Sequence, residues 1–599
     1  RTLLRDHWVV DPASRRAGVA TVEVHSGKIA RLEWRDGIVE ARRTFIEGAE
    51  PGLKDPTTMI LPALVDLHAH FRQPGAGASE SVASGEAAAA HGGYGAVALM
   101  PNSEPAADHP ALLRELVRSE SPLGLALMPI AAATLGRAGV ALSPMRELAA
   151  AGAVAFSDDG SPIADPALFR NALISAGALG LPLIEHCEDP ALTAGGEAAD
   201  GLISMSLGLK PWPAAGEISA VVRNIALLRE ALQAGAAGFS TGRSDNHRTS
   251  EGKDTPAANA SAQELSGIAR AFEGLNHGVV QVVSDYNLLQ GPGQFDAEFD
   301  LVEALARASG RPLSLTWLQR DPGGEQFRQI QARVEAAVQE GLPLYLQTAA
   351  RGIGVITGFD ASFHPFMGFA GYKEVAHLPL AERAAALREP ERKARILSQK
   401  SEPLAGDGSA VPPLVDILLA QIERISGRMF PLAQQPDYAP TVMQSFYVRA
   451  RQAGTSALEA IYDYLCAGDG QGLIYFPIFN YNDGSLATLR QMLEHPRALF
   501  GLGDAGAHVG TVCDASFTTF MLTHWVQGRG KDTLPLETVI EMLTRRNAHY
   551  LGLQDRGVIA VGMRADINAI DPSQLSVGLP QLVRDLPAGG KRFLQKAKG

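Results

Sequence analysis

The chain has 599 residues, which is too long for one ordinary compact core. Of these residues 46% are hydrophobic and 20% are charged, and the formal net charge is −12. The acidic balance argues against a nucleic-acid partner, which would favour a basic face, and no uninterrupted apolar run approaches the roughly 20 residues that span a bilayer. Three widely separated cysteines, Cys187, Cys466 and Cys513, give no disulfide framework, so we expect a soluble cytoplasmic protein without a membrane or nucleic-acid partner.

The first predicted elements are short strands near the N-terminus. Val19–Leu32 has the pattern of strands around a Ser-Gly turn, and Gly557–Asp571, far away in the sequence, has the same character. Two such flanks predict that residues 1–56 and 546–599 form a small β-sandwich from the two chain ends.

Between the flanks, short apolar runs alternate with stretches such as Asp165–Gly177, which carries Ala and Leu at helical spacing. This alternation is typical of an α/β fold in which helices wrap a parallel sheet, and eight such units would close a (β/α)8 TIM-type barrel. The sequence holds ten candidate strands: Leu61–His68, Gly95–Met100, Leu125–Ile130, Ala153–Ser157, Leu181–Glu185, Ala236–Thr241, Gly278–Ser284, Pro312–Leu318, Leu342–Gln347 and Ala498–Leu502.

A repeat offers a reason for the two surplus strands. Ala151–Ser157 reads AGAVAFS and Ala234–Ser240 reads AGAAGFS, and each follows an Ala/Leu-rich helix and precedes a polar loop. Duplication of one unit or the joining of two related genes would produce this repeat, and chance similarity of short Ala/Gly runs is the alternative. We expect an eight-stranded barrel in which one strand–helix pair is displaced or irregular.

The barrel is assigned to residues 57–371, with its last strand and helix in residues 484–545. The segment between, residues 372–483, is long, helical and charge-rich, and it predicts an insertion or a lid.

The strongest local signal for chemistry is the run VDLHAH at the end of the first barrel strand. Alternation along a strand puts His68 and His70 on the same face. Two imidazoles on one face, at the carboxyl end of a barrel strand, form half of a metal site, whereas an isolated His-x-His pair usually lies on the surface.

Further acids and imidazoles follow later strands. FSDDG carries Asp158 and Asp159, IEHCED carries His186, and GLGDAGAH carries Asp504. Carboxylate oxygens and imidazole nitrogens are the ligands that a pair of divalent ions would need. Asp-Asp-Gly is also good turn chemistry, and His186 alone would fit a core histidine with satisfied hydrogen bonds.

Residues 1 to about 225 resemble a dihydroorotase of the amidohydrolase superfamily. The resemblance rests on DLHAHFRQPG at 66–75, ALMPN at 98–102, FSDDG at 156–160, IEHCED at 184–189 and GLISMSLGL at 201–209. It implies one or two Zn²⁺ ions, or another divalent metal, at the positions His68, His70, Asp159, His186 and Asp504. It also implies that the substrate's carboxylate is held by Arg72, Asn102 and His508, in keeping with the bidentate bonds of a guanidinium.

Many relatives bridge two metal ions with a carboxylated lysine. This chain has no lysine between Lys54 and Lys210, so that variant is excluded from the first five strands. Asp159 is the natural substitute, as in the dihydroorotase subgroup that uses aspartate.

From about residue 226 the chain resembles an N-acyl-D-amino-acid deacylase, another branch of the superfamily. The matching runs are FSTGR at 239–243, NHRTS at 246–250, GDAGAHVG at 503–510 and CDASF at 513–517. A dihydroorotase carries a further metal-binding histidine one strand after His186, and here Gly238–Thr241 lacks it. Either His247 or His277 would have to compensate, or the second metal is weakly held or absent.

The sequence therefore predicts a metal-dependent hydrolase of a carbon–nitrogen amide bond other than a peptide bond. In this reading, Asp504 accepts a proton from water and passes it to the leaving nitrogen. The N-terminal motifs favour dihydroorotase-like opening of a cyclic amide, chain coverage favours deacylation of a linear amide, and the missing histidine favours an inactive scaffold. The substrate is a small amide bearing a carboxylate, and the sequence leaves monomer and homo-oligomer open.

Overall fold

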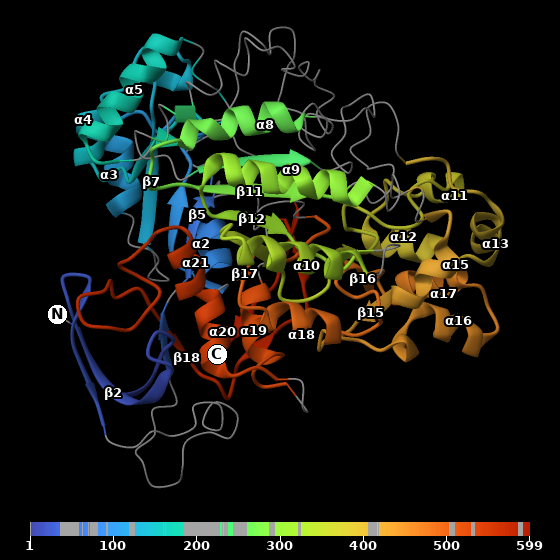
Figure 1. The fold of residues 1–599 in the computed structure, drawn as a ribbon. Coiled ribbons are helices and arrows are strands. Elements are labelled where there is room, and N and C mark those ends of the chain that lie inside the picture. The colour runs from blue at the N-terminus through green and yellow to red at the C-terminus, as the bar shows by residue number, and fades with distance from the viewer. Residues whose placement is uncertain are drawn as a thin grey trace.

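A computed structural model describes residues 2–35, 59–62, 64–69, 71, 82–91, 94–118, 126–159, 161, 163, 165–181, 183–184, 228–229, 232, 238–243, 260–286, 294–320, 325–404, 416, 419–501, 510–514, 516–528, 533–584 and 591–599. Helices and strands alternate along most of this length, so the α/β class is confirmed (Figure 1). None of the described helices is both long and apolar enough to cross a membrane.

The two chain ends meet in one mixed sheet, where the sequence predicted a small β-sandwich. Its strand order is β18-β4-β1-β2-β3, with β1 at Thr2–Asp11, β2 at Arg16–His25, β3 at Lys28–Trp34, β4 at Met59–Pro62 and β18 at Ile567–Ile570. Ser26 and Gly27 link β2 to β3 with φ of 50° and 73°, the left-handed values that a tight two-residue hairpin requires. The amide of Ile29 donates to the carbonyl of Met563 at 2.9 Å and ties the hairpin to the far end of the chain.

A parallel sheet of five strands follows. It contains β5 (Leu64–Ala69), β6 (Tyr94–Leu99), β7 (Ala126–Ala132), β8 (Ala155–Ser157) and β9 (Leu183–Ile184) in that order. Its helices are α2 (Val82–His91), α3 (Pro110–Arg118), α4 (Met145–Ala150) and α5 (Pro166–Ala178). The start of α5 is fixed by Asp165, whose carboxylate accepts the amide of Ala167 at 2.8 Å, with Pro166 at the first helical position.

A second parallel sheet also has five strands. It contains β10 (Gly238–Arg243), β11 (Val279–Ser284), β12 (Leu313–Thr316), β13 (Leu344–Thr348) and β17 (Ala498–Phe500). Its helices are α8 (Ala262–Ala269), α9 (Gln294–Ser309), α10 (Gln326–Gln339) and α18 (Ala487–Glu494). Val280, Leu313 and Leu344 are fully buried in a core that also contains Phe299 of α9 and Val334 of α10.

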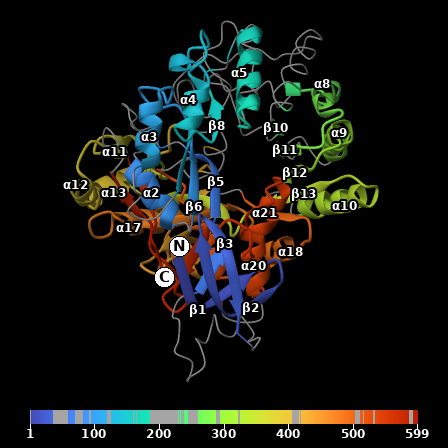
Figure 2. The same cartoon turned by 90° about the vertical axis from the view of Figure 1, so that its left-hand side faces the viewer.

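All ten predicted strands are therefore present, two more than an eight-stranded barrel holds. The described ladders join them into two sheets of five, and β7 stands upright in Figure 1 where β11 runs across the view. Figure 2 shows α3 and α4 on one side of the molecule and α9 and α10 on the other. Each sheet has its own helices and its own buried core.

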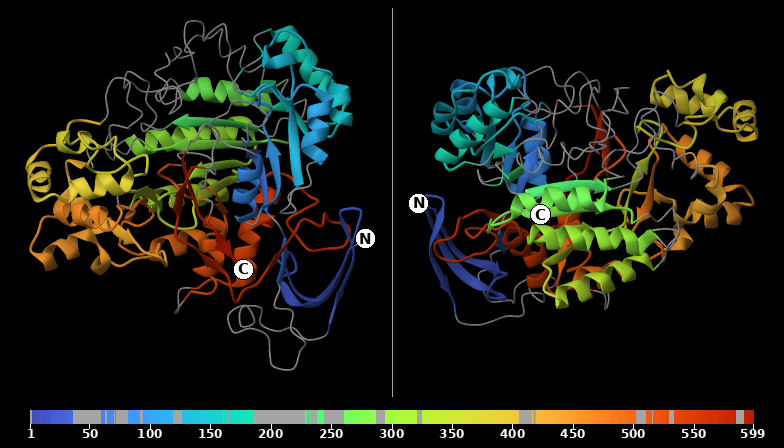
Figure 3. Two further views of the ribbon diagram at one scale, coloured as in Figure 1. Left: turned by 180° about the vertical axis from the view of Figure 1, so that it is seen from behind. Right: turned by 45° about the horizontal axis from the view of Figure 1, so that its top comes forward.

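The segment between β13 and β17 adds a smaller unit with a separate apolar core, seen at one side of both views in Figure 3. Its antiparallel sheet has the order β14-β16-β15, with β14 at Ile353–Thr357, β15 at Phe430–Leu432 and β16 at Leu473–Phe479. Its helices are α11 (Ala370–Lys373), α12 (Leu380–Leu387), α13 (Pro390–Ser398), α15 (Ile422–Ile425), α16 (Phe446–Ala453) and α17 (Ala457–Cys466). The sequence did not predict this antiparallel sheet.

The chain ends with helices and short strand pairs. The helices are α19 (Phe517–Thr523), α20 (Leu536–Leu543) and α21 (Arg545–Tyr550). The strands are β19 (Ser576–Val577), β20 (Gln581–Val583), β21 (Arg592–Leu594) and β22 (Ala597–Lys598), which pair as β19-β22 and β20-β21.

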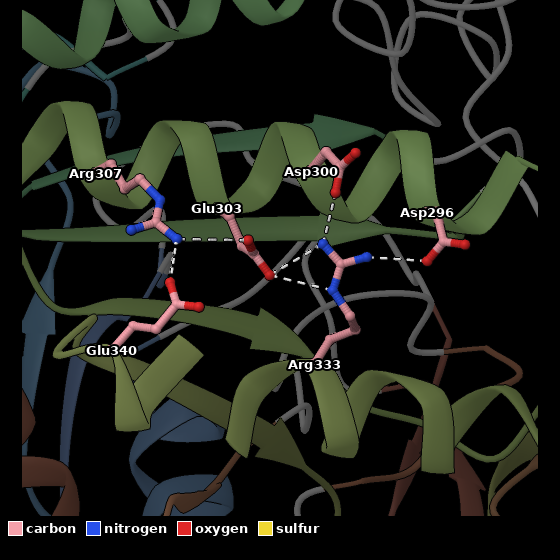
Figure 4. A network of polar contacts seen from close by, with 6 residues as sticks. All are labelled: Asp296, Asp300, Glu303, Arg307, Arg333 and Glu340. Atoms are coloured by element: carbon pink, nitrogen blue, oxygen red, sulfur yellow. Dashed lines mark hydrogen bonds and ion pairs between the residues drawn. The ribbon is translucent and has the colours of Figure 1, made fainter. Parts of the chain in front are cut away.

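An ion-pair network joins α9 to α10 on the outer surface (Figure 4). The Arg333 guanidinium lies 2.9 Å from a carboxylate oxygen of Asp296, 2.6 Å from one of Asp300 and 3.0 Å from one of Glu303. Arg307 lies 2.6 Å from Glu340, so two arginines each connect the two helices. Single exposed pairs contribute little to stability, and a shared arginine connecting three carboxylates holds the helices in register more firmly.

A buried histidine gives the smaller unit a predicted pH dependence. The ring centroid of His364 lies 4.4 Å from that of Tyr372 and 5.2 Å from that of Phe359. Burial, with the positive charges of Arg383 and Lys591, lowers the pKa of His364 from 6.5 to about 3. The folded protein therefore holds His364 neutral, whereas the unfolded chain takes up a proton below about pH 6.5.

We expect His364→Asn to make the free energy of unfolding less sensitive to acid. His364 stabilises the fold fully above about pH 6.5, and this contribution falls by about 1.4 kcal/mol per pH unit as the pH drops toward 3. Asn keeps an acceptor for the amide of Phe366, which donates to Nδ1 of His364 at 3.2 Å. The free energy of unfolding of both proteins is measured by urea denaturation between pH 7 and pH 5. An equal loss of stability with falling pH in the two proteins would contradict the lowered pKa of His364.

Candidate active site

The carboxyl ends of the first parallel sheet lie along one edge. Ala132 of β7 pairs with Ser157 of β8, and Ser157 pairs with Ile184 of β9, so these three strands end together. Asn102 comes three residues after β6, and Asp159 two residues after β8. Because active sites of barrel-type folds form at this edge, the polar residues that follow these strands are the candidates.

Two of the predicted site residues are in direct contact at this edge. The side-chain amide of Asn102 donates to Oδ2 of Asp159 at 2.6 Å, across 57 residues of sequence. Asp159 is 8% exposed, and its own amide donates to the hydroxyl of Ser157 at 2.9 Å. Asn102 thus orients the Asp159 carboxylate, while Ser157 of β8 holds the backbone amide of the same residue.

The two aspartates of FSDDG have different surroundings. Asp158 is fully buried and accepts the backbone amides of Ala133 and Thr134. Burial raises the pKa of Asp158, and its hydrogen bonds with Thr134 and Ala133 and the charge of Arg137 lower it in part. The carbonyl of Asp158 also accepts the amide of Ser161 at 2.7 Å, so the run forms a turn as well as presenting a carboxylate.

Of the six remaining predicted site residues, the backbone of one, His68, is described, and the other five lie outside the described residues. His68 lies in β5 between Asp66 and Ala69, which pair with Val97 and Leu99 of the neighbouring strand β6. The positions outside the described residues are His70, Arg72, His186, Asp504 and His508. Within the described part of the chain no group of three His, Cys, Asp or Glu side chains could hold a metal ion.

Of the two candidates for the missing histidine, His247 and His277, only His277 lies within the described residues. His277 precedes β11, at the amino end of that strand, and its ring contacts the carbonyl of Leu232. His277 therefore lies at the amino end of β11, far from the carboxyl edge where the candidate site residues lie. His247 lies outside the described residues.

Sequence reasoning missed a polar cluster at the carboxyl edge of the second sheet. Asp285 follows β11 and Arg320 follows β12, and the two form an ion pair with side chains 8% and 7% exposed. The backbone amide of Gln319 donates to Oδ1 of Asn480 in the loop after β16, and its side chain donates to Asp483 and accepts the amide of Asn482. The signal in the sequence was a charged residue shortly after each of two predicted strands, Asp285 one residue and Arg320 two residues beyond them.

Comparison with family models divides the chain in two. The dihydro-orotase-like family matches residues 57–240, and the amidohydrolase family matches residues 214–589. The two matches meet in residues 214–240, which include the second copy of the AGA-x-x-FS repeat. The resemblance of the two parts of the chain to two branches of one superfamily is confirmed.

Two individual relatives each match over about a third of the chain. The dihydroorotase of Pelotomaculum thermopropionicum is 39% identical over 230 residues, which are 38% of this chain and 52% of the relative. The dihydroorotase of Mycobacterium leprae is 43% identical over 206 residues, 33% of this chain and 48% of the relative. The chain thus spans about half the length of the curated relatives it matches.

Solved structures match over most of the chain at low similarity. An N-acyl-D-glutamate deacylase from Bordetella bronchiseptica, complexed with zinc and a phosphonate inhibitor, is 16% identical with a TM-score of 0.45 and covers 99% of this chain and 94% of its own. An L-hydantoinase from Arthrobacter aurescens is 13% identical with a TM-score of 0.32 and covers 99% of this chain and 92% of its own.

Proposed function

The chain belongs to the amidohydrolase family, and from this premise we propose that it is a metal-dependent hydrolase of carbon–nitrogen bonds other than peptide bonds. Its substrate is a small amide that bears a carboxylate, with a cyclic, dihydroorotate-like amide as the first candidate. The observation that carries the proposal is the contact between Asn102 and Asp159, two residues predicted for the site from separate motifs.

The metal is a divalent ion, Zn²⁺ in the first instance, with one or two ions bound. Asp159 fits this role because its carboxylate is oriented at the strand end by Asn102, and His68 lies on the strand next to β6. His70, His186 and Asp504 would complete a set of imidazole and carboxylate ligands that suits zinc. When bound, the ion polarises the amide carbonyl and makes water a better nucleophile.

The protein's own residues bind the substrate and move the proton. Asp504 accepts the proton of the attacking water and returns it to the leaving nitrogen. Arg72 and His508 hold the substrate's carboxylate, together with Asn102. One N–H of the Asn102 amide is already used by Asp159, so this residue links the bound carboxylate to the ligand carboxylate.

Two other functions compete with this one. Deacylation of a linear N-acyl-D-amino acid is favoured by the deacylase-like runs at 239–250 and 503–517, which lie in the longer matched part of the chain. An inactive scaffold is favoured by the absent histidine in β10. The hydrogen-bonded Asp159 argues against the scaffold, because such a chain has no need of an oriented carboxylate at this edge.

An assay with three substrates tests the proposal. We expect the metal-loaded protein to hydrolyse dihydroorotate faster than a hydantoin or an N-acetyl-D-amino acid, with metal content measured on the same sample. Asn102→Ala should lower kcat/KM about 10- to 100-fold, the value of one hydrogen bond to a charged group. Ser103→Ala is the matched control, since its hydroxyl donates to the carbonyl of Pro105 at 3.0 Å and does not contact Asp159.

The outcomes separate the three functions. Faster hydrolysis of the N-acetyl-D-amino acid would establish the deacylase. A metal-loaded protein that hydrolyses none of the three would support the scaffold and contradict the proposal.

A further inference from the structure

Asp158 is buried beside the candidate site, and its carboxylate is fully engaged by the loop that follows β7. Oδ1 accepts the amides of Ala133 at 2.8 Å and Thr134 at 3.0 Å. Oδ2 accepts the hydroxyl of Thr134, and the side chain has no exposed surface. Burying a carboxylate costs free energy, and these three donors offset that cost only in this geometry.

Thr134 is itself held by the same loop. Its hydroxyl oxygen accepts the amide of Gly139 at 2.9 Å, and its backbone forms an isolated bridge with Leu142. The amide of Leu135 donates to the carbonyl of Ala141 at 2.9 Å, which closes the loop. The loop after β7 is thus closed by its own hydrogen bonds, and the Thr134 hydroxyl links it to Asp158.

A second contact from this loop reaches the neighbouring residue directly. The Arg137 guanidinium donates to the backbone carbonyl of Asp159. Arg137 has φ of 53° and follows Gly136, which has φ of 62°. A non-glycine residue in this left-handed region is strained, and such strain is retained where the surrounding structure requires a fixed direction.

We propose that Asp158 and Thr134 are positioning residues that fix the turn on which the Asp159 carboxylate is presented. Asp158 ties the end of β8 to the loop after β7, while Asn102 orients the Asp159 side chain from β6. The two acids of FSDDG have separate roles: Asp158 anchors the turn, and Asp159 carries the chemistry. This inference rests on the proposed function for the role of Asp159 as a metal ligand.

Three variants test the proposal. Thr134→Val keeps the shape of the side chain but removes the hydroxyl, whereas Thr134→Ser retains it. Ser143→Ala is the matched control, because its buried hydroxyl donates to the carbonyl of Ala132 at 2.7 Å and does not contact Asp158. All three are made in the full chain.

Zinc affinity of the metal-free protein, measured by competition with a chelator, is the first readout. We expect Thr134→Val to weaken binding about 10- to 100-fold, the usual effect of losing a residue that orients a metal ligand. Thr134→Ser should restore affinity to within a few-fold of the parent. Ser143→Ala should lower thermal stability while it leaves zinc affinity unchanged.

Backbone hydrogen exchange, measured without metal in a peptide covering residues 155–163, is the second readout. We expect faster exchange in Thr134→Val than in Ser143→Ala or Thr134→Ser. Equal exchange in Thr134→Val and Ser143→Ala would overturn the proposal, and so would unchanged zinc affinity in Thr134→Val. A parent protein that takes up no metal would refute the proposed function, and the exchange measurement would still decide the anchoring role.

Discussion

Replacing His68 and His70 together with Ala is expected to abolish the uptake of a divalent metal ion. His68 lies in β5, beside the strand that leads to Asn102 and its contact with Asp159. Loss of a residue that only orients a ligand typically weakens metal binding about 10- to 100-fold, so loss of two imidazole ligands should exceed about 100-fold. Elemental analysis after incubation with Zn²⁺ and gel filtration measures the effect.

The control for this change removes the same number of imidazoles elsewhere. His25 and His109 are both exposed, so His25→Ala with His109→Ala should leave the metal content at the level of the parent. Full metal retention in the His68/His70 variant would reject the assignment of this strand as half of the metal site.

Replacing Asp504 with Asn is expected to lower turnover with little change in folding. Asp504 follows β17, the last strand of the second sheet, and its position in GDAGAH is outside the described residues. Asn keeps the shape but lacks the basic oxygen that accepts a proton from water. General acid–base catalysis is typically worth on the order of 10²–10⁴-fold, and any loss of metal ligation would add to this.

The alternative is that Asp504 only caps a glycine-rich turn. That role predicts lower stability with nearly normal turnover in the folded, metal-loaded fraction. Asp437→Asn is the matched control, because Asp437 is an exposed turn carboxylate that accepts the amide of Ala439 at 2.9 Å. Turnover of Asp504→Asn within a few-fold of the parent, per metal-loaded molecule, would remove it as the proton carrier.

Local patterns predicted the strands, and long-range pairing determined how they assemble. All ten apolar runs are strands, because a short run of buried residues bounded by turns carries its own signal. The division into two sheets depends on which edges pair, and a ladder such as β13 with β17 joins residues about 150 positions apart. The sheet of β14, β15 and β16 was missed for the same reason, since its pairings cross a long helical segment.

The candidate site shows the same division. Asn102 and Asp159 were both identified from their motifs, but their hydrogen bond was visible only in the structure. The resemblance selected Asp159 as the metal ligand, but the hydrogen bonds of Asp158 with the loop after β7 were visible only in the structure. The Asp285–Arg320 pair was missed because each residue alone is an ordinary charge after a strand.

The separate cores of the two parallel sheets bear on how the protein loses activity. The core around Phe156 and Leu183 supports the edge that carries Asp159, whereas Ala498, next to the segment of Asp504, belongs to the larger core. Regions with distinct cores open as distinct cooperative units, each with its own free energy. A hydrolase built across both would be inactivated by opening of the weaker unit alone, while most of its secondary structure stayed intact.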